Sequence, residues 1–164
     1  MEELSVETSS CARYNEKTHA LYLNIMDRTK TKLETLSLPF FQNLPDRFKL
    51  TTYSVNGRVL TWHINVLDDD VLYFLFGGID YELNKQYNAY FLNLAGIIRE
   101  SIEWGYDTID LGQTAEIAKT RMGGVPSDRN IFVYHRKGWV RSIFRFGKKY
   151  IHLRRDFPPA NVFK

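Results

Sequence analysis

The sequence predicts a single α/β domain, of α+β character, in which helices flank both faces of a mixed, mostly antiparallel sheet. The length of 164 residues, with 44% hydrophobic side chains, suits one domain that has its own core. Three strand-like segments follow two helical ones, and a strand–helix–strand unit comes next. Such a unit joins parallel strands by a right-handed crossover. We therefore expect residues 1–164 to form one domain with a mixed sheet between helices.

Two helices are predicted before the first strand. Residues 12–26 have an apolar stripe made by Leu21, Leu23, Ile25 and Met26. Residues 36–44 predict a shorter helix, with a serine as its N-cap and a proline in its first turn. Residues 1–10 are polar and acidic, and we interpret them, together with Cys11, as a polar tail.

The next three segments predict antiparallel strands. Residues 48–55 and 59–67 flank Asn56-Gly57, and this dipeptide favours a tight hairpin turn because both residues accept positive φ. After an acidic turn, residues 71–76 are almost entirely apolar, as expected of a strand with both faces covered.

The second half of the chain begins with a long helix. Residues 87–104 have apolar side chains at helical spacing, and Gly105 follows at the position where glycine often ends a helix. The remaining predicted elements are a strand at 108–111, a helix at 114–122, a strand at 130–135 and a final hairpin made of 139–146 and 150–153 around Gly147.

A resemblance to a known family lies at the end of the third strand and beyond. That strand continues into Leu75-Phe76-Gly77-Gly78-Ile79-Asp80-Tyr81, and the later short strand reads Ile109-Asp110-Leu111-Gly112-Gln113, with Lys119, Gly123 and Gly124 following. This ordered set resembles the acyl-CoA N-acyltransferase (GNAT) superfamily, in its FemAB-like branch that includes BioF/CelD-like acetyltransferases. The likeness covers roughly residues 21–134. The chain departs from the common superfamily pattern because no glycine lies between Gly78 and the long helix.

The resemblance implies an N-acyltransferase that moves an acyl group from acyl-CoA, typically acetyl-CoA, to an amine by direct attack on the thioester. It implies no covalently bound cofactor. One alternative is a FemAB-type transferase that takes its acyl group from an aminoacyl-tRNA. A second is a non-catalytic GNAT-like module of a larger protein, since no tyrosine lies in the helix at 114–122 where the superfamily places its general acid. A homodimer or a second GNAT-like domain would be compatible with each.

The expected cofactor-binding residues follow from the same resemblance. Phe76, Gly77 and Gly78 end the buried strand, where two residues without side chains would let backbone amides approach a thioester or pantetheine arm. Tyr87 and Asn88 begin the long helix, whose N-terminus suits a pyrophosphate. Gln113 and Lys119 match recurring family positions. Each feature also has a structural interpretation: a strand-ending turn, an ordinary helix end, or an ion pair with Asp110 or Glu116.

The expected catalytic residues are Asp80, Tyr81 and Glu82 beside the strand end, with Asp80 as first choice for orienting or deprotonating the amine. The structural alternative is that Asp80 caps the loop and Asn84 the following helix. His63 is a candidate base by its ordinary pKa, although a lone histidine in a strand is more often structural. Tyr134 is a candidate general acid, with Tyr81 as another.

Several classes of protein are excluded or disfavoured. No apolar run is long enough for a membrane span, and the N-terminus lacks the pattern of a signal peptide, so we expect a cytoplasmic protein. A single cysteine allows no intrachain disulfide. The four histidines are far apart and have no cysteine partner, so no metal site is expected. Residues 136–164 hold nine basic side chains and one acid, a patch suited to phosphates of a cofactor, lipid or nucleic acid.

Overall fold

The computed structural model describes residues 3–29, 34–113, 116–128, 132 and 134–147. The chain divides into two compact units, Met1–Thr114 and Ala115–Lys164. The first unit holds a sheet and the helices around it, and the described residues of the second include the helices α5 (Glu116–Arg121) and α6 (Gly138–Gly147). One domain over the whole chain stays a prediction.

The first unit contains a five-stranded sheet in the order β1-β2-β3-β4-β5. Its strands are β1 (Leu4–Ser10), β2 (Phe48–Val55), β3 (Arg58–Asp68), β4 (Val71–Ile79) and β5 (Thr108–Asp110). The first four pair antiparallel, and β5 pairs parallel to β4. The predicted mixed, mostly antiparallel sheet is therefore confirmed. The Asn56-Gly57 turn between β2 and β3 has positive φ at both residues, +50° and +76°, as a tight hairpin requires.

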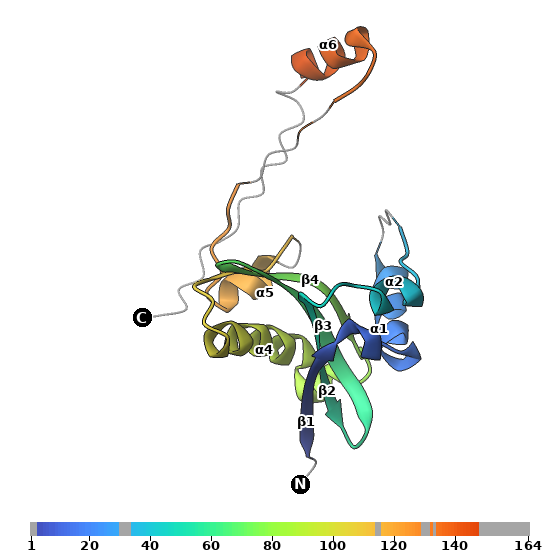
Figure 1. Ribbon diagram of the computed structural model, residues 1–164, viewed down its shortest axis with the longest axis vertical. Coiled ribbons are helices and arrows are strands. Elements are labelled where there is room, and N and C mark those ends of the chain that lie inside the picture. Colours follow the sequence, from blue (N-terminus) through green and yellow to red (C-terminus); the bar gives the residue numbers. More distant parts are fainter. Residues whose placement is uncertain (1–2, 30–33, 114–115, 129–131, 133, 148–164) are drawn as a thin grey trace. The chain divides into compact units, whose positions relative to one another are not determined.

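The helices of the first unit lie on both faces of this sheet, with α1 and α2 on one face and α4 on the other (Figure 1). Their bounds are α1 (Glu16–Arg28), α2 (Leu38–Gln42), α3 (Asn84–Tyr87) and α4 (Ala89–Glu103), with a short 3-10 turn at Cys11–Arg13. A capping box fixes the start of α1, because the Asn15 side chain accepts from the Thr18 amide and the Thr18 hydroxyl accepts from the Asn15 amide.

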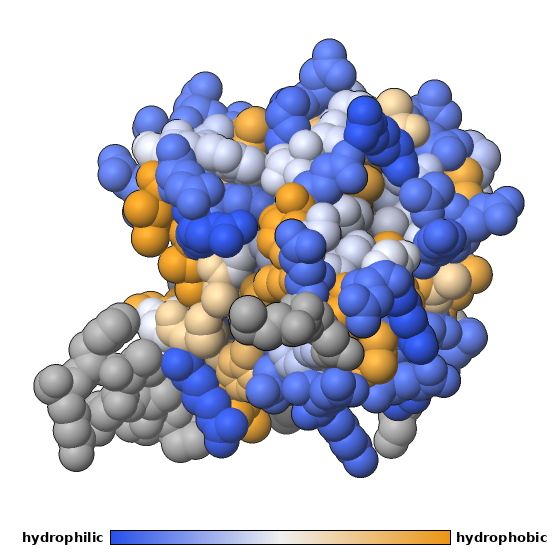
Figure 2. Space-filling view, turned by 90° about the horizontal axis from the view of Figure 1, so that it is seen from below, coloured by the Kyte–Doolittle hydropathy of each residue, from blue (hydrophilic) through white to orange (hydrophobic). Residues whose placement is uncertain are grey.

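Successive residues of β3 reach the two helical layers in turn. The Trp62 indole N–H donates to the Thr18 carbonyl of α1 at 2.8 Å, whereas His63 pairs with Glu100 of α4 at 2.9 Å. This is the alternation that a pleated strand imposes. The α1 face holds a cluster of aromatic side chains in which Tyr14 and Phe41 pack around Trp62. The surface seen in Figure 2 is mostly hydrophilic, with apolar side chains in scattered groups.

Three expectations about the N-terminal half differ from the structure. Residues 4–10 form the edge strand β1 rather than a tail, paired along their whole length with β2. Cys11 is buried beside the aromatic cluster, with its thiol 3.6 Å from the Phe48 carbonyl, and does not lie in a polar tail. β4 also continues through Gly77 and Gly78 to Ile79, so the paired glycines lie inside the strand rather than ending it.

The expected hairpin near the C-terminus is wrong where the structure describes it. Residues 139–146 lie in the helix α6, not in a strand. Of the strand expected at 130–135, the described residues Phe132, Tyr134 and His135 have no regular secondary structure. The strand expected at 150–153 lies outside the described residues.

Candidate functional site

The strands β4 and β5 pair over a short stretch and then diverge. Their parallel pairing runs from Val71 opposite Thr108 to Tyr73 opposite Asp110. The chain then turns at Gly112, whose φ is +70° and whose amide donates to the Asp110 carboxylate at 2.8 Å. A Cβ on Gly112 would lie 3.3 Å from the Phe74 carbonyl. The chain after β5 therefore turns away from β4 at the level of Phe74. β4 runs on to Ile79 without β5 beside it.

A β-bulge marks the point at which the two strands separate. Ile64 of β3 is opposite Phe76 and the next residue, Asn65, is opposite Phe74, so Leu75 is the additional residue of β4. Beyond the bulge the Asp80 amide donates to the Leu60 carbonyl at 2.8 Å. Antiparallel pairing alternates, so the backbone N–H and C=O of Gly77 and Ile79 point away from β3, toward the side of β5. Within the described residues, no strand pairs with this part of β4.

A cavity of about 760 Å³ lies beside the end of β4. Its walls come from α1, from the β2–β3 hairpin and from the three residues that follow β4. The lining residues are Lys17, Leu21, Asn24, Asp27, Arg28, Gly57, Arg58, Val59, Asp80, Tyr81 and Glu82. The cavity therefore brings together three of the five predicted catalytic residues, Asp80, Tyr81 and Glu82, and adds basic side chains that the sequence had not indicated.

Arg58 holds two of the three acidic residues that line this cavity, Asp80 and Glu82, in place. Its Nε donates to Asp80 Oδ2 at 2.7 Å, and a terminal guanidinium nitrogen lies 2.7 Å from Glu82 Oε2. The hydrogen bonds that Arg58 donates to Glu82 and then to Asp80 raise the pKa of Arg58 above its ordinary value, so the guanidinium stays charged. Arg58 begins β3, directly after the β2–β3 turn. Because β3 pairs antiparallel with β4, the start of β3 lies beside the residue that follows Ile79.

Asp80 shapes the loop that follows β4. Its Oδ2 meets Arg58, and its Oδ1 accepts from the amides of Glu82 at 3.0 Å and Leu83 at 3.3 Å. Both carboxylate oxygens are therefore engaged, and the side chain is 7% exposed. These contacts match the loop cap that the sequence offered as the structural alternative. Glu82 differs, since its side chain is 82% exposed.

Tyr81 presents its ring to a cation of α1. The Arg28 guanidinium carbon lies 4.1 Å from the ring centroid, a cation–π contact. Lys17 also lines this wall. The cavity thus combines exposed positive charge on α1 with the exposed carboxylate of Glu82, a setting that suits a ligand carrying both signs of charge or a phosphate next to an amine.

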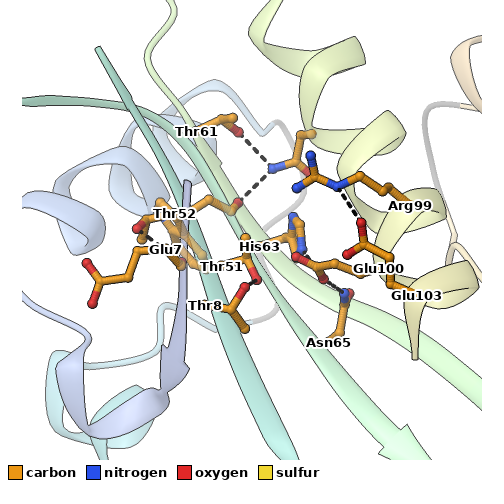
Figure 3. A network of polar contacts seen from close by, with 12 residues as sticks. Glu7, Thr8, Thr51, Thr52, Thr61, His63, Asn65, Arg99, Glu100 and Glu103 are labelled. Carbon is orange, nitrogen blue, oxygen red and sulfur yellow. Dashed lines mark hydrogen bonds and ion pairs between the residues drawn. The ribbon is translucent and has the colours of Figure 1, made fainter. Parts of the chain in front are cut away.

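His63 does not belong to this cavity. It is fully buried on the α4 face, with Nε2 2.9 Å from Glu100 Oε2, and the same oxygen accepts from the Asn65 amide at 2.9 Å (Figure 3). The cavity is lined from α1, on the opposite face of β3. The proposed role of His63 as a base therefore finds no support in its position, and the structural interpretation fits its contacts.

The predicted cofactor-binding residues of β4, which are Phe76, Gly77 and Gly78, differ in their surroundings. A Cβ on Gly78 would lie 2.1 Å from Trp62 Nε1, so this glycine is required for α1 and Trp62 to pack. A Cβ on Gly77 would come within 3.2 Å of the Trp62 carbonyl. The Phe76 ring packs edge-on to Phe41 at 5.2 Å, within the aromatic cluster. The part of this segment that faces the edge of β4 left by β5 is the backbone, above all that of Gly77.

One backbone N–H group at the start of α4 has a hydrogen-bond acceptor within the protein. Asn88 adopts a left-handed conformation with φ +49° and makes no side-chain cap. Asn84 Oδ1 instead accepts from the Tyr90 amide at 3.1 Å, the capping alternative offered by the sequence. Tyr87 packs against the small cluster around Leu60 and Ala89. Amides of the first turn other than that of Tyr90 are the ones that a phosphate would use.

The remaining predicted residues follow β5 in the chain. Gln113 is exposed just beyond the Gly112 turn. Lys119 is on α5 and Tyr134 precedes α6, so both belong to the second unit. The Tyr134 ring is 77% exposed, with the Arg141 guanidinium 5.8 Å from its centroid.

Sequence reasoning missed the basic side of the cavity. Arg58 follows directly after the Asn56-Gly57 turn, and the hairpin register was the signal that could have placed it beside residue 80. Lys17 and Arg28 are on the polar side of α1, and only the packing of that helix over β4 brings them to the site.

The family model described as "Acetyltransferase (GNAT) domain" matches residues 8–120 of the chain. The protein belongs to this family, as the sheet and the diverging β4 and β5 had suggested. A search of curated proteins finds no match to the sequence.

Three solved structures with the same fold are distant from this chain in sequence. An aminoglycoside N-acetyltransferase, AAC(6')-Iy, in complex with CoA has a TM-score of 0.61 and 10% identity, covering 84% of this chain and 97% of that one. The ribosomal-protein-alanine N-acetyltransferase of Brucella melitensis biovar Abortus 2308 has a TM-score of 0.59 and 9% identity, covering 81% of this chain and 99% of that one. An aminoglycoside acetyltransferase from an uncultured soil metagenomic sample has a TM-score of 0.58 and 9% identity, covering 82% of this chain and 95% of that one. At such identities the likeness establishes the fold.

Proposed function

We propose that the protein transfers an acyl group from acyl-CoA to an amine by direct attack of the amine on the thioester. The observation that carries this proposal is the open backbone edge of β4 beyond Leu75, where β5 has turned away. An amide-bearing pantetheine arm can pair with such an edge as a further strand would. Membership of the GNAT family and the CoA complex of the related aminoglycoside enzyme support the same ligand.

The reaction needs little covalent chemistry from the protein. The amine nitrogen forms a bond to the carbonyl carbon, the carbon–sulfur bond breaks, the amine loses a proton and the thiolate takes one up. Backbone amides at the bulge and at Gly77 can stabilise the negative charge on the carbonyl oxygen during attack. The N-terminal turn of α4, with Tyr87 and Asn88, and the side chains of Gln113 and Lys119 remain proposed contacts for the rest of the cofactor.

The cavity at the end of β4 is the proposed place of the amine. Glu82 is an exposed carboxylate of that cavity, and it can bind the ammonium group or accept its proton. Asp80, held by Arg58 and two amides, positions Glu82 through the loop rather than acting as a base itself. The related solved structures include enzymes named for aminoglycosides, compounds that carry amines. A polar amine of that general kind suits the charged walls of this cavity.

The test is a thiol-release assay with acetyl-CoA and a panel of amines, comparing Glu82→Gln with Glu103→Gln. Both glutamates are exposed and each pairs with an arginine, so neither change should alter folding. We expect Glu82→Gln to lower kcat/KM at least about tenfold, the scale of a lost acid–base or positioning contact, and Glu103→Gln to leave it unchanged. Equal activity of both variants would remove Glu82 from the mechanism. Failure of acetyl-CoA to bind would contradict the proposal as a whole.

A non-catalytic GNAT-like module is the second candidate, because both oxygens of Asp80 are engaged and His63 is buried away from the cavity. It predicts acyl-CoA binding at most, with no turnover of any amine. The FemAB-type variant takes an aminoacyl-tRNA as donor, and the excess of basic residues after Arg136 favours it. Stabilisation by aminoacyl-tRNA and not by acetyl-CoA, lost steeply with added salt, would select that variant.

A further inference from the structure

The helix α6 has an exposed apolar side. Its sequence reads Gly-Trp-Val-Arg-Ser-Ile-Phe-Arg-Phe-Gly, and the large apolar side chains fall on one side of the helix at i, i+4 and i+7 spacing. Their exposed fractions are Trp139 64%, Ile143 59%, Phe144 40% and Phe146 77%. None of the α6 residues is buried. Four adjacent large apolar side chains left in water indicate a surface that binds something.

The opposite side of α6 is cationic. Arg141 and Arg145 are four residues apart, so they lie one turn above the other on the polar side. Arg136 and Lys137 precede the helix directly. From Arg136 to the C-terminus the sequence has nine basic residues and a single acid, Asp156. The partner of α6 must therefore offer an apolar medium bordered by negative charge.

We propose that α6 lies on the surface of a bilayer that contains anionic lipids. A tryptophan and two phenylalanines on the apolar side, with arginines on the polar side, are the composition of helices that lie in the membrane interface. The helix has 10 residues, whereas a span needs about 20. No helix in the described residues is long and apolar enough to cross a membrane. The arrangement therefore fits a helix parallel to the surface.

The apolar side distinguishes a lipid surface from a nucleic acid. Phosphates of RNA or DNA would engage the arginines alone and would leave Ile143 and Phe146 in water. A lipid surface satisfies both sides, because headgroup phosphates meet the arginines while the acyl chains receive the rings. This inference does not depend on the proposed acyl transfer, and its readout is independent of any activity.

The test is co-sedimentation of the full chain with vesicles of phosphatidylcholine alone or of phosphatidylcholine with phosphatidylserine. We expect binding to the anionic vesicles and little to the neutral ones. The double variant Arg141→Glu, Arg145→Glu should weaken binding by at least roughly thirtyfold, from about 1 kcal/mol for each basic residue. Trp139→Ser with Phe146→Ser should weaken it by at least about tenfold through lost burial. The control is Ile102→Ser, an apolar residue 73% exposed on α4, which should bind as the original chain does.

Four results would overturn the proposal. They are no binding to anionic vesicles, equal binding to both vesicle types, equal losses in the Ile102→Ser control, or an apolar double variant that binds as tightly as the original chain. A chain that sediments with RNA but not with vesicles would assign the basic residues to nucleic acid instead. Far-UV circular dichroism of each variant establishes that the changes leave the sheet unit folded.

Discussion

The two faces of the sheet are built from alternate residues of the same strand and differ in chemistry. On the α1 face Trp62 and Ile64 pack among aromatic rings, and the one polar atom of Trp62 is paired. On the α4 face His63 and Asn65 meet a buried carboxylate, Glu100 (Figure 3). The α1 layer is held mainly by apolar burial, whereas the α4 layer combines polar contacts with a smaller apolar cluster around Leu60 and Ala89.

The α4 face is also incompletely paired. Four buried polar atoms have no hydrogen-bond partner among the described residues: Tyr53 Oη, His63 Nδ1, Asn65 Oδ1 and Glu100 Oε1. No comparable atom occurs in the aromatic cluster of the described residues. Buried polar groups without partners reduce stability, so the α1 face should contribute more to the free energy of unfolding. The cavity and its Arg58 lie on the α1 side of the sheet.

The largest effect is expected from removing the centre of the aromatic face. Trp62→Ala should lower the free energy of unfolding by about 3–5 kcal/mol, because it leaves a large cavity and removes the indole hydrogen bond to the Thr18 carbonyl. Urea denaturation followed by far-UV circular dichroism measures the change. Trp104→Ala, at a residue 36% exposed, is the comparison and should cost clearly less, on the order of 1–2 kcal/mol. Similar costs for the two variants would mean that the aromatic face does not dominate.

A smaller loss is expected from the buried carboxylate of the polar face. Glu100→Ala leaves His63 Nε2 and the Asn65 amide without an acceptor, and should cost about 2–3 kcal/mol. Glu103→Ala, one turn away on the exposed side with a 3.6 Å contact to Arg99, should change stability little. If Glu100→Ala were no worse than Glu103→Ala, the polar contacts would not hold α4 to the sheet.

The sequence predicted the sheet well where hydrophobic patterning and turn chemistry agree. The Asn56-Gly57 turn set the β2–β3 hairpin, and β2 was predicted with its observed bounds, Phe48–Val55. β1 was missed because its side chains carry almost no pattern. It is an edge strand, six of its seven residues are exposed, and backbone pairing to β2 holds it. α6 was predicted as a strand because Trp, Val, Ile and Phe favour strands, although the same residues also fit a helical period.

The candidate site was predicted only in part, for a physical reason. The residues after β4 could be found from their place at a strand end, and Asp80, Tyr81 and Glu82 do line one cavity. The face to which a β3 side chain points depends on register, which the sequence left undetermined for His63. Contacts that depend on how α1 packs, such as that of Arg28 with Tyr81, have no local signal at all.

A glycine of α4 tests how closely that helix approaches the sheet. A Cβ on Gly96 would lie 1.7 Å from Tyr53 Oη. In an open helix Gly→Ala would stabilise by roughly 1 kcal/mol, but here overpacking should outweigh that gain, for a net loss of about 1 kcal/mol. Adding Tyr53→Phe removes an unpartnered hydroxyl and should recover part of the loss, which a double-mutant cycle from urea midpoints measures. Stabilisation by Gly96→Ala alone would mean that α4 lies farther from β2.

The smallest expected effect is the alkaline titration of the aromatic face. Burial raises the pKa of Cys11 from 9.0 to about 11, with the charge of Lys49 opposing this shift. Between these values the unfolded thiol has lost its proton while the folded one keeps it, so rising pH favours unfolding. The stability that Cys11 contributes is therefore fully present below pH 9.0 and declines toward about pH 11. At about pH 10 the loss should be on the order of 1 kcal/mol. Urea midpoints of the original chain and of Cys11→Ala, measured from about pH 8 to about pH 10, should approach one another as pH rises, whereas parallel curves would show that the thiol is already accessible to water in the folded protein.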